Sequence, residues 1–193
     1  MRRISKVSAL IAVVGISLAA GLGPASAADS VTQNVTGGTK TASVTTLALT
    51  DVATSHAAVN NTGIMTLAAD DSTGTGAGWN VTEAVSSFAY TGTNSGTPIA
   101  AANFSITSVG TITSSAGQAI DTTGTDLAPT GPQSGTLAGV SGALSTPVTV
   151  LRAGVNFGQG TYSQPINVNL AVPANSRAGT YTGTLTTSIT SGP

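Results

Sequence analysis

Apolar and polar residues alternate in short runs along most of this chain, and each run ends near Gly, Asn or Asp. In GWNVT, Trp79 and Val81 alternate with Asn80 and Thr82, and every second side chain of INVNLAV (166–172) is apolar. A period of two residues is typical of a β-strand with one buried and one solvated face. The pattern predicts strands at 42–51, 63–68, 78–82, 103–114, 147–151, 160–163, 166–172 and from 180 onward.

The order of these runs predicts an all-β fold. Helical periodicity is limited to a weak Ala-rich patch at 99–103 and to the N-terminal leader, and Gly-rich turns separate the runs. Many short strands without intervening helices predict an antiparallel β-sandwich, Ig-like or related. Within 103–114 we expect Phe104, Ile106 and Ser108 to share a face. The segment 114–147 predicts long loops around one or two short strands, without a domain boundary.

The C-terminal stretch AGTYTGTLTTSITSGP (178–193) has the clearest alternation. Its apolar positions predict a core face that also carries one polar residue, Thr187. The simplest pairing is an antiparallel one between 166–172 and the strand from 180, across the loop 173–179. A shift of one residue would expose every apolar side chain, so the pattern fixes the register. The predicted core residues of the last strand are Tyr181, Leu185 and Ile189.

The first 28 residues, MRRISKVSALIAVVGISLAAGLGPASAA, have the layout of a secretory signal peptide. A basic start precedes an apolar run and then small residues, which predicts cleavage after Ala27 or Ala28. The apolar run is shorter than the ~20 residues of a membrane span, which argues against an anchor. We therefore expect a helical signal peptide at 1–27, a flexible segment at 28–39, one secreted domain at 40–193, and no membrane association after cleavage.

Charge and cysteine content narrow the class of partners. The chain has 6 basic and 7 acidic residues and no cysteine, and three of the basic residues lie in the leader. The remaining cations, Lys40, Arg152 and Arg177, are too few for the basic surface that nucleic acid or an anionic membrane requires. Without disulfides, an exported domain depends on its core and its β-ladders for stability.

The residues that could carry chemistry are few and scattered. The single histidine, His56, follows Ser55, but no G-x-S-x-G motif occurs, so we interpret it as a solvated loop residue. The seven carboxylates do not suggest the pair, roughly 5–10 Å apart, that a glycosidase needs. Asp70-Asp71 and Asp121 with Asp126 could offer oxygen ligands to calcium, but their spacing matches no established loop. We expect no catalytic residue, no resident metal and no cofactor.

Two stretches resemble the signatures of the WxL domain of Gram-positive surface proteins. GWNVTEAVSSFAYTG (78–92) is similar to the first signature, with Trp79, Val81 in place of Leu, and Phe88. The C-terminal stretch is similar to the second, but the usual second Trp is replaced by Thr187. The matching residues there are Tyr181, Gly183, Leu185 and Ile189, the last in place of Leu.

The resemblance implies an exported all-β domain that attaches non-covalently to the cell wall. Peptidoglycan is then the expected ligand, and separately anchored surface proteins are expected partners. The ligand-binding residues carried over are Trp79, Val81, Phe88, Tyr181, Leu185, Thr187 and Ile189. At Thr187, either another side chain fills the space of the missing ring or part of a binding surface is lost.

Several alternatives stay open. Trp79 could be a core anchor instead of a ligand contact, and Tyr90, Phe157 and Tyr162 could be exposed rings that stack on sugars. The protein could also be an assembly subunit whose unpaired edge strands join copies of itself or another surface protein. A third alternative, an exported carbohydrate-active enzyme, would need an acid pair in a cleft.

Overall fold

The computed structural model describes residues 30–122, 129–134 and 142–192. The predicted signal peptide and Asp126 lie outside these residues. Val35–Pro193 form one compact unit. In the part of the chain that is described, no helix has the length and hydropathy needed to cross a lipid bilayer.

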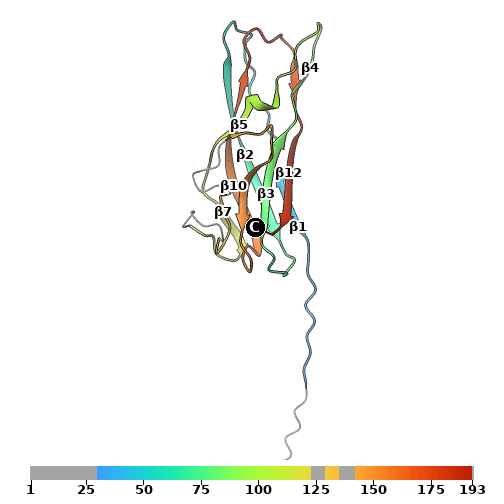
Figure 1. Cartoon of the computed structure of the whole chain (residues 1–193), viewed down its shortest axis with the longest axis vertical. Helices are drawn as coiled ribbons and strands as arrows, with labels where there is room; N and C mark the ends of the chain where they lie inside the picture. Colours follow the sequence, from blue (N-terminus) through green and yellow to red (C-terminus); the bar gives the residue numbers. More distant parts are fainter. Residues whose placement is uncertain (1–29, 123–128, 135–141, 193) are drawn as a thin grey trace, which may run out of the picture. The chain divides into compact units, whose positions relative to one another are not determined.

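The larger sheet is built around two long antiparallel strands that pair over their full length (Figure 1). The β2 strand (Val59–Asp71) pairs with β10 (Gly160–Val172) from Val59↔Val172 to Asp71↔Gly160. The strand order is β1-β2-β10-β5-β8, and β6 pairs with β10 beyond β5. The remaining strands are β1 (Lys40–Val44), β5 (Phe104–Val109), β6 (Thr113–Gly117) and β8 (Gly142–Ala143).

The second sheet has the order β12-β3-β9-β7, and a two-stranded ribbon, β11-β4, accompanies it. The C-terminal strand β12 pairs with β3 in antiparallel register, and β11 pairs with β4 in the same sense. The C-terminal segment therefore runs along β4 and then along β3. The elements are β3 (Trp79–Val85), β4 (Ala89–Thr91), β7 (Gln133–Ser134), β9 (Val148–Ala153), β11 (Thr180–Thr182), β12 (Leu185–Ser191) and the 3-10 turn η1 (Ala101–Asn103).

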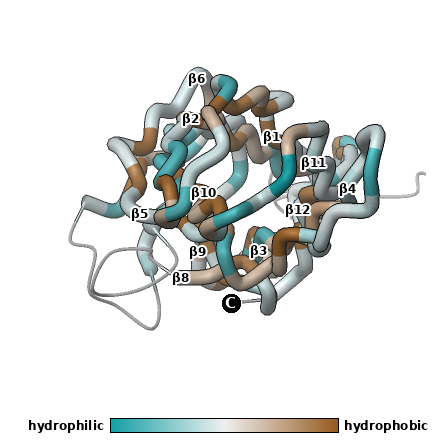
Figure 2. Tube along the Cα trace, turned by 90° about the horizontal axis from the view of Figure 1, so that it is seen from above, coloured by the Kyte–Doolittle hydropathy of each residue, from teal (hydrophilic) through white to brown (hydrophobic). Residues whose placement is uncertain are grey.

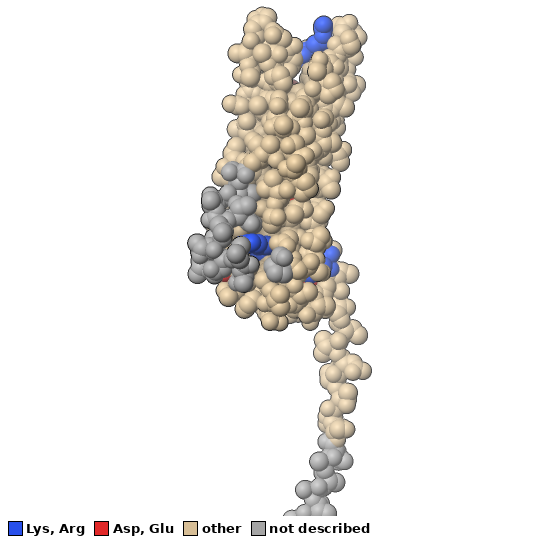
Figure 3. Space-filling view, in the orientation of Figure 1, with Lys and Arg blue, Asp and Glu red and all other residues tan. Residues whose placement is uncertain are grey.

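The core lies between the two sheets, where apolar residues, brown in Figure 2, gather. Along β3 every second residue is buried, and along β10 every second residue from Tyr162 to Leu170 is buried. The outward residues are mostly Thr, Ser and Asn, and charged side chains are sparse on the face seen in Figure 3. This division matches the alternation that predicted it. The buried apolar residues include Met65, Leu67, Trp79, Val81, Ile99, Phe104, Ile106, Leu144, Leu151, Tyr162, Ile166 and Val168.

The prediction of an all-β antiparallel sandwich is confirmed, but the predicted pairing of the last two strands is wrong. The β10 strand lies in the larger sheet, while β11 and β12 belong to the other ladders. Both edges of β10 are occupied, by β2 on one side and by β5 and β6 on the other. No edge was left for the C-terminal strand, so the loop 173–179 carries the chain from one sheet to the other.

Two strand predictions also need correction. The strand expected at 42–51 ends at Val44, and a single backbone bond from Thr45 N to Thr66 O (3.0 Å) continues it. Ser108 is exposed and does not share the buried face of Phe104 and Ile106. The reason is a bulge: the β10–β5 register shifts between Asn167 and Val168, which reverses the alternation beyond Ile106.

Candidate functional site

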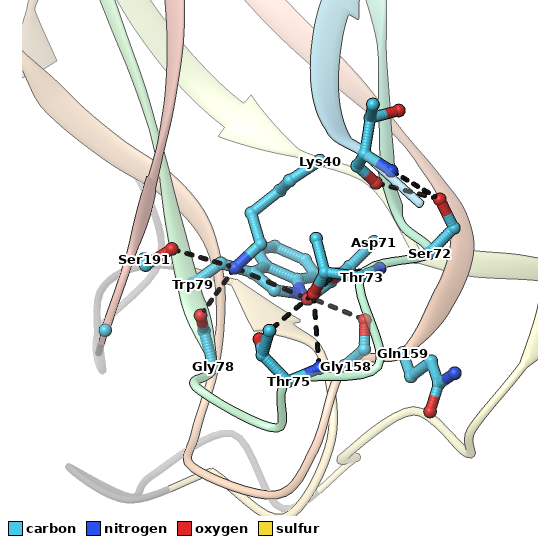
Figure 4. A network of polar contacts seen from close by, with 12 residues as sticks. Lys40, Asp71, Ser72, Thr73, Thr75, Gly78, Trp79, Gly158, Gln159 and Ser191 are labelled. Carbon is cyan, nitrogen blue, oxygen red and sulfur yellow. Dashed lines mark hydrogen bonds and ion pairs between the residues drawn. The ribbon is translucent and has the colours of Figure 1, made fainter. Parts of the chain in front are cut away.

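Trp79 lies in the core at one end of the sandwich. Its side chain is 0% exposed, its ring lies 6.2 Å from the Tyr162 ring, and its Nε1 donates to Gly158 O at 2.9 Å (Figure 4). Gly158 has a φ of 84°, and a Cβ there would lie 2.6 Å from Nε1, so this approach requires glycine. Burial leaves no accessible surface on Trp79 and Val81, which corrects the ligand-binding role expected for them. The same holds for Tyr162, which was considered as a ring that stacks on sugars.

Beside Trp79, a polar network connects the first and the last strand of the domain (Figure 4). Lys40 Nζ lies 3.4 Å from Asp71 Oδ2 and donates to Gly78 O (3.0 Å) and Ser191 Oγ (3.3 Å). Burial alone would raise the pKa of Asp71, but hydrogen bonds from Thr73 and the charge of Lys40 outweigh it and hold the pKa below its ordinary value. The network thus ties the start of β1 to the end of β12.

Thr187 is on the core-facing side because it partners a buried acid. Glu83 is 0% exposed and lies directly opposite Thr187 in the β3–β12 ladder. The Thr187 hydroxyl donates to Glu83 Oε2 at 3.0 Å, and Glu83 Oε1 has no hydrogen-bond partner within the described residues. Burial raises the pKa of Glu83 to about 7, and the bond from Thr187 opposes this rise. A Trp at 187 would remove this hydroxyl, so Thr187 has a structural role of its own.

At the other end of the sandwich the two sheets diverge around an open groove of about 970 Å³. Its two walls are the segments 47–54 and 176–183, and every residue of both segments lines it. Its floor reaches the core at Phe88, Ile99 and Leu170. A smaller cavity of about 300 Å³ shares Leu47, Leu49, Phe88 and Gly183 with the groove and extends it to Leu185.

The wall 176–183 is held by a pair of tyrosines. Tyr90 on β4 and Tyr181 on β11 are register partners with ring centroids 5.2 Å apart. Their hydroxyls donate to Ala178 O (2.9 Å) and Arg177 O (3.0 Å), which fixes the loop before β11. The side chain of Tyr181 is half-buried and lines the groove. The three residues considered for sugar stacking do not line the groove: Tyr90 and Phe157 are half-buried outside its lining, and Tyr162 is buried. Tyr181, which was predicted as a core residue, is the tyrosine that does line it.

Phe88 forms the floor where the two motif stretches meet. Its ring contacts Phe104 edge-on at 5.6 Å, and its backbone pairs with Ile99. A Cβ on Gly183 would lie 3.0 Å from the Phe88 ring, so the glycine two residues after Tyr181 allows the strand to pass over it. Leu185 and Ile189 are half-buried and pack against the core, which agrees with their predicted facing.

Few charged side chains line the groove among the described residues. Asp51 is the one carboxylate that lines it there, and Arg177 is the one cation. Glu83 is enclosed in the core, and Asp70 accepts a hydrogen bond from Thr161 at 2.6 Å. His56 is exposed and its Nδ1 lies 2.7 Å from Asn175 Oδ1, in a contact between loops.

Metal ligation by the predicted aspartates finds no support in the part that can be described. No group of three or more His, Cys, Asp or Glu residues there could hold a metal ion. Asp71 is engaged by Lys40, and Asp121 accepts hydrogen bonds from Thr130, while Asp126 lies outside the described residues.

Sequence reasoning did not identify two features of the site. Glu83 shares a face with Trp79, Val81 and Val85. A single acid among apolar residues on one face of a strand could have predicted a buried carboxyl group. The part 47–51 of the groove wall was predicted as the end of a strand, and no structure was predicted for 52–54. No local pattern distinguishes a strand from this groove wall.

No protein-family model, curated protein or solved structure matches the chain. Its function therefore has to be inferred from its own contacts, burial and charge.

Proposed function

We propose that the chain is a WxL-like, exported and non-catalytic protein that associates non-covalently with the Gram-positive cell wall. The ligand is peptidoglycan or another wall polymer, and anchored surface proteins are further partners. The observation that carries this proposal is the open groove between segments 47–54 and 176–183, which joins residues from both motif stretches. In this proposal the signature residues Phe88, Tyr181 and Gly183 contribute to the floor and one wall of the groove, and only some of them contact the ligand.

The chemistry of the groove supports a glycopeptide ligand. The half-buried Tyr181 ring offers a face for a sugar ring, and Asn61 and Thr50 offer polar groups. Arg177 is exposed at the same wall and suits the carboxylates of a wall peptide. An apolar groove with a few convergent polar groups is the usual form of a binding site.

A non-catalytic role is supported by the shortage of usable acids. Glycoside hydrolysis needs two carboxyl groups on either side of the scissile bond. Asp51 is the single described carboxylate at the groove. A binding role needs no such pair.

Sedimentation with isolated cell walls tests this proposal. The mature protein should sediment with walls in excess of an equally acidic control protein. Ala48→Glu, at an exposed position in the groove, should reduce sedimentation several-fold, whereas Thr62→Glu, at an exposed position of β2 outside the groove, should not. Equal sedimentation of both variants and of the control protein would contradict wall binding by the groove.

A second candidate function is that of an assembly subunit. The β12 strand is the last strand of its sheet and β11 pairs only with β4, so both leave one edge open within the described region. Open edges are common sites of strand addition. The low charge of the chain, 7%, also leaves little repulsion between copies.

A further inference from the structure

The groove has the form of a slot for one extended strand. Consecutive residues of both walls line it, and neighbouring side chains of an extended segment point to opposite sides, so the backbone of each wall also borders the groove. The β11 edge that faces away from β4 is unpaired in the described chain. Across the slot, the backbone of 46–54 makes one hydrogen bond within the described residues, in which Thr50 O accepts from Asn61 Nδ2 (2.7 Å). Among the described residues, most backbone groups of 46–54 and one edge of β11 are therefore open to an added strand above an apolar floor.

The chain also carries a segment with the properties of a missing strand. Residues 30–36, SVTQNVT, adopt no secondary structure and carry no charge. Val31 is 97% exposed and Val35 is 91% exposed, the two highest values among the exposed large hydrophobic residues. They are four residues apart, so in a strand both point to the same face. Thr32, Asn34 and Thr36 would then face solvent.

We propose that residues 30–36 of a second copy occupy the groove as an added strand. The valines pack on the floor formed by Phe88, Ile99 and Leu170, and Gln33 meets the polar groups of Thr50 and Asn61. The arm has seven residues and each groove wall has eight, so the lengths match. The backbone of the arm supplies the hydrogen bonds that both walls lack.

The donor is a second copy because the base of the arm is directed away from its own domain's slot. Gly38 N donates to Ser72 O (2.9 Å) and Thr39 N to Ser72 Oγ (3.1 Å), which fixes this part of the chain beside the end of β2. The β1 strand then runs from Lys40 toward the slot, so the arm starts at the far end of β1.

Such contacts are head-to-tail, and head-to-tail contacts that do not close produce open chains of subunits. The terminal copy of each chain keeps an empty groove. This inference rests on the second candidate function and extends the first, because the empty terminal groove remains available to the cell wall.

Disulfide trapping in mixed variants tests the contact directly, since the chain has no cysteine of its own. A Val35→Cys protein mixed with an Ala48→Cys protein should form a covalent heterodimer under mild oxidation. Ile64→Cys provides the matched control, because Ile64 is 66% exposed on β2 and does not line the groove. Equal trapping at both positions, or none at Ala48→Cys, would overturn the proposal.

Solution size distinguishes this inference from wall binding. The mature protein should form concentration-dependent oligomers in sedimentation velocity, and Val31→Asp with Val35→Asp should abolish them. Thr32→Asp with Thr36→Asp adds the same charge to the other face of the arm and should leave them intact. A monomer at all concentrations that still sediments with walls would refute the arm contact alone, whereas oligomers without wall affinity would refute the wall-binding function alone.

Discussion

The two ends of the sandwich each contain an aromatic pair, and the pairs have different roles. Trp79 and Tyr162 lie 6.2 Å apart and are 0% and 1% exposed, whereas Tyr90 and Tyr181 lie 5.2 Å apart and are only half-buried. The first pair closes one end of the core, with the Lys40–Asp71 network beside it. The second pair supports one wall of an open groove. An aromatic pair thus fills the core at one end and supports the wall of an open groove at the other.

The largest effect should come from truncating the closed end. Trp79→Ala removes a fully buried ring and its bond to Gly158, so we expect a loss of about 3–5 kcal/mol in the free energy of unfolding. Tyr181→Ala should cost only about 1–2 kcal/mol, because part of that ring is already in water. Urea denaturation followed by circular dichroism measures both. Equal losses would mean that the two ends do not differ as described.

The next effect is a pH dependence from Glu83, which lies between the two ends. Its pKa is about 7 in the folded protein and near its ordinary 4.5 in the unfolded chain, so the folded state binds the proton more tightly. The contribution of Glu83 to the free energy of unfolding is therefore fully present below about pH 4.5. It falls by roughly 3 kcal/mol as the pH rises to about 7. Glu83→Gln should remove this decline. Asp71 acts in the opposite sense: because its pKa is lowered in the folded protein, its contribution to the free energy of unfolding is lost as the pH falls.

A smaller effect is expected at Thr187. Thr187→Val keeps the shape but removes the hydroxyl that bonds Glu83, which should cost about 1–3 kcal/mol at neutral pH. The pKa of Glu83 should rise further, so the decline should extend to higher pH. Ser188→Ala, on the exposed side of β12, is the control and should leave the pH profile unchanged. In a Glu83→Leu background, which has no acceptor for the Thr187 hydroxyl, the cost of Thr187→Val should shrink, and a full cost there would show that the bond is not its cause.

The smallest effect concerns the floor of the groove. Gly183→Ala places a Cβ 3.0 Å from the rigid Phe88 ring, and we expect a loss of about 1 kcal/mol. Gly63→Ala meets the flexible ends of Leu47 and Leu49 at 2.8 and 2.9 Å, and it should cost less because those side chains can move. Urea midpoints of the two variants provide the comparison. A larger loss at Gly63 would show that the opposite wall is the more rigid one.

The facing of residues within a strand could be predicted, whereas the pairing of strands could not. Tyr181, Leu185 and Ile189 face the core as expected, because side-chain direction in a strand follows from local geometry. The neighbour of a strand depends on which edges other strands leave open. For β10 those edges were taken by segments as distant as 59–71 and 104–117.

The site was predictable only in part for the same reason. The motif residues Phe88, Tyr181 and Gly183 do lie at the groove, although Trp79 and Val81 lie in the core. The facing wall 47–54 comes from a segment without a motif. No spacing in the sequence relates it to 176–183, because the two segments meet only after both sheets have formed.

The sequence by itself determined the strand-rich fold, the two-faced character of each strand and the small number of groups able to carry chemistry, since these depend on composition and on the period of the chain. Tertiary structure alone decided that Thr187 faces a buried acid, that Trp79 is enclosed, and that the segments 47–54 and 176–183 line one groove. These depend on long-range register, which is set when distant strands compete for the same edges.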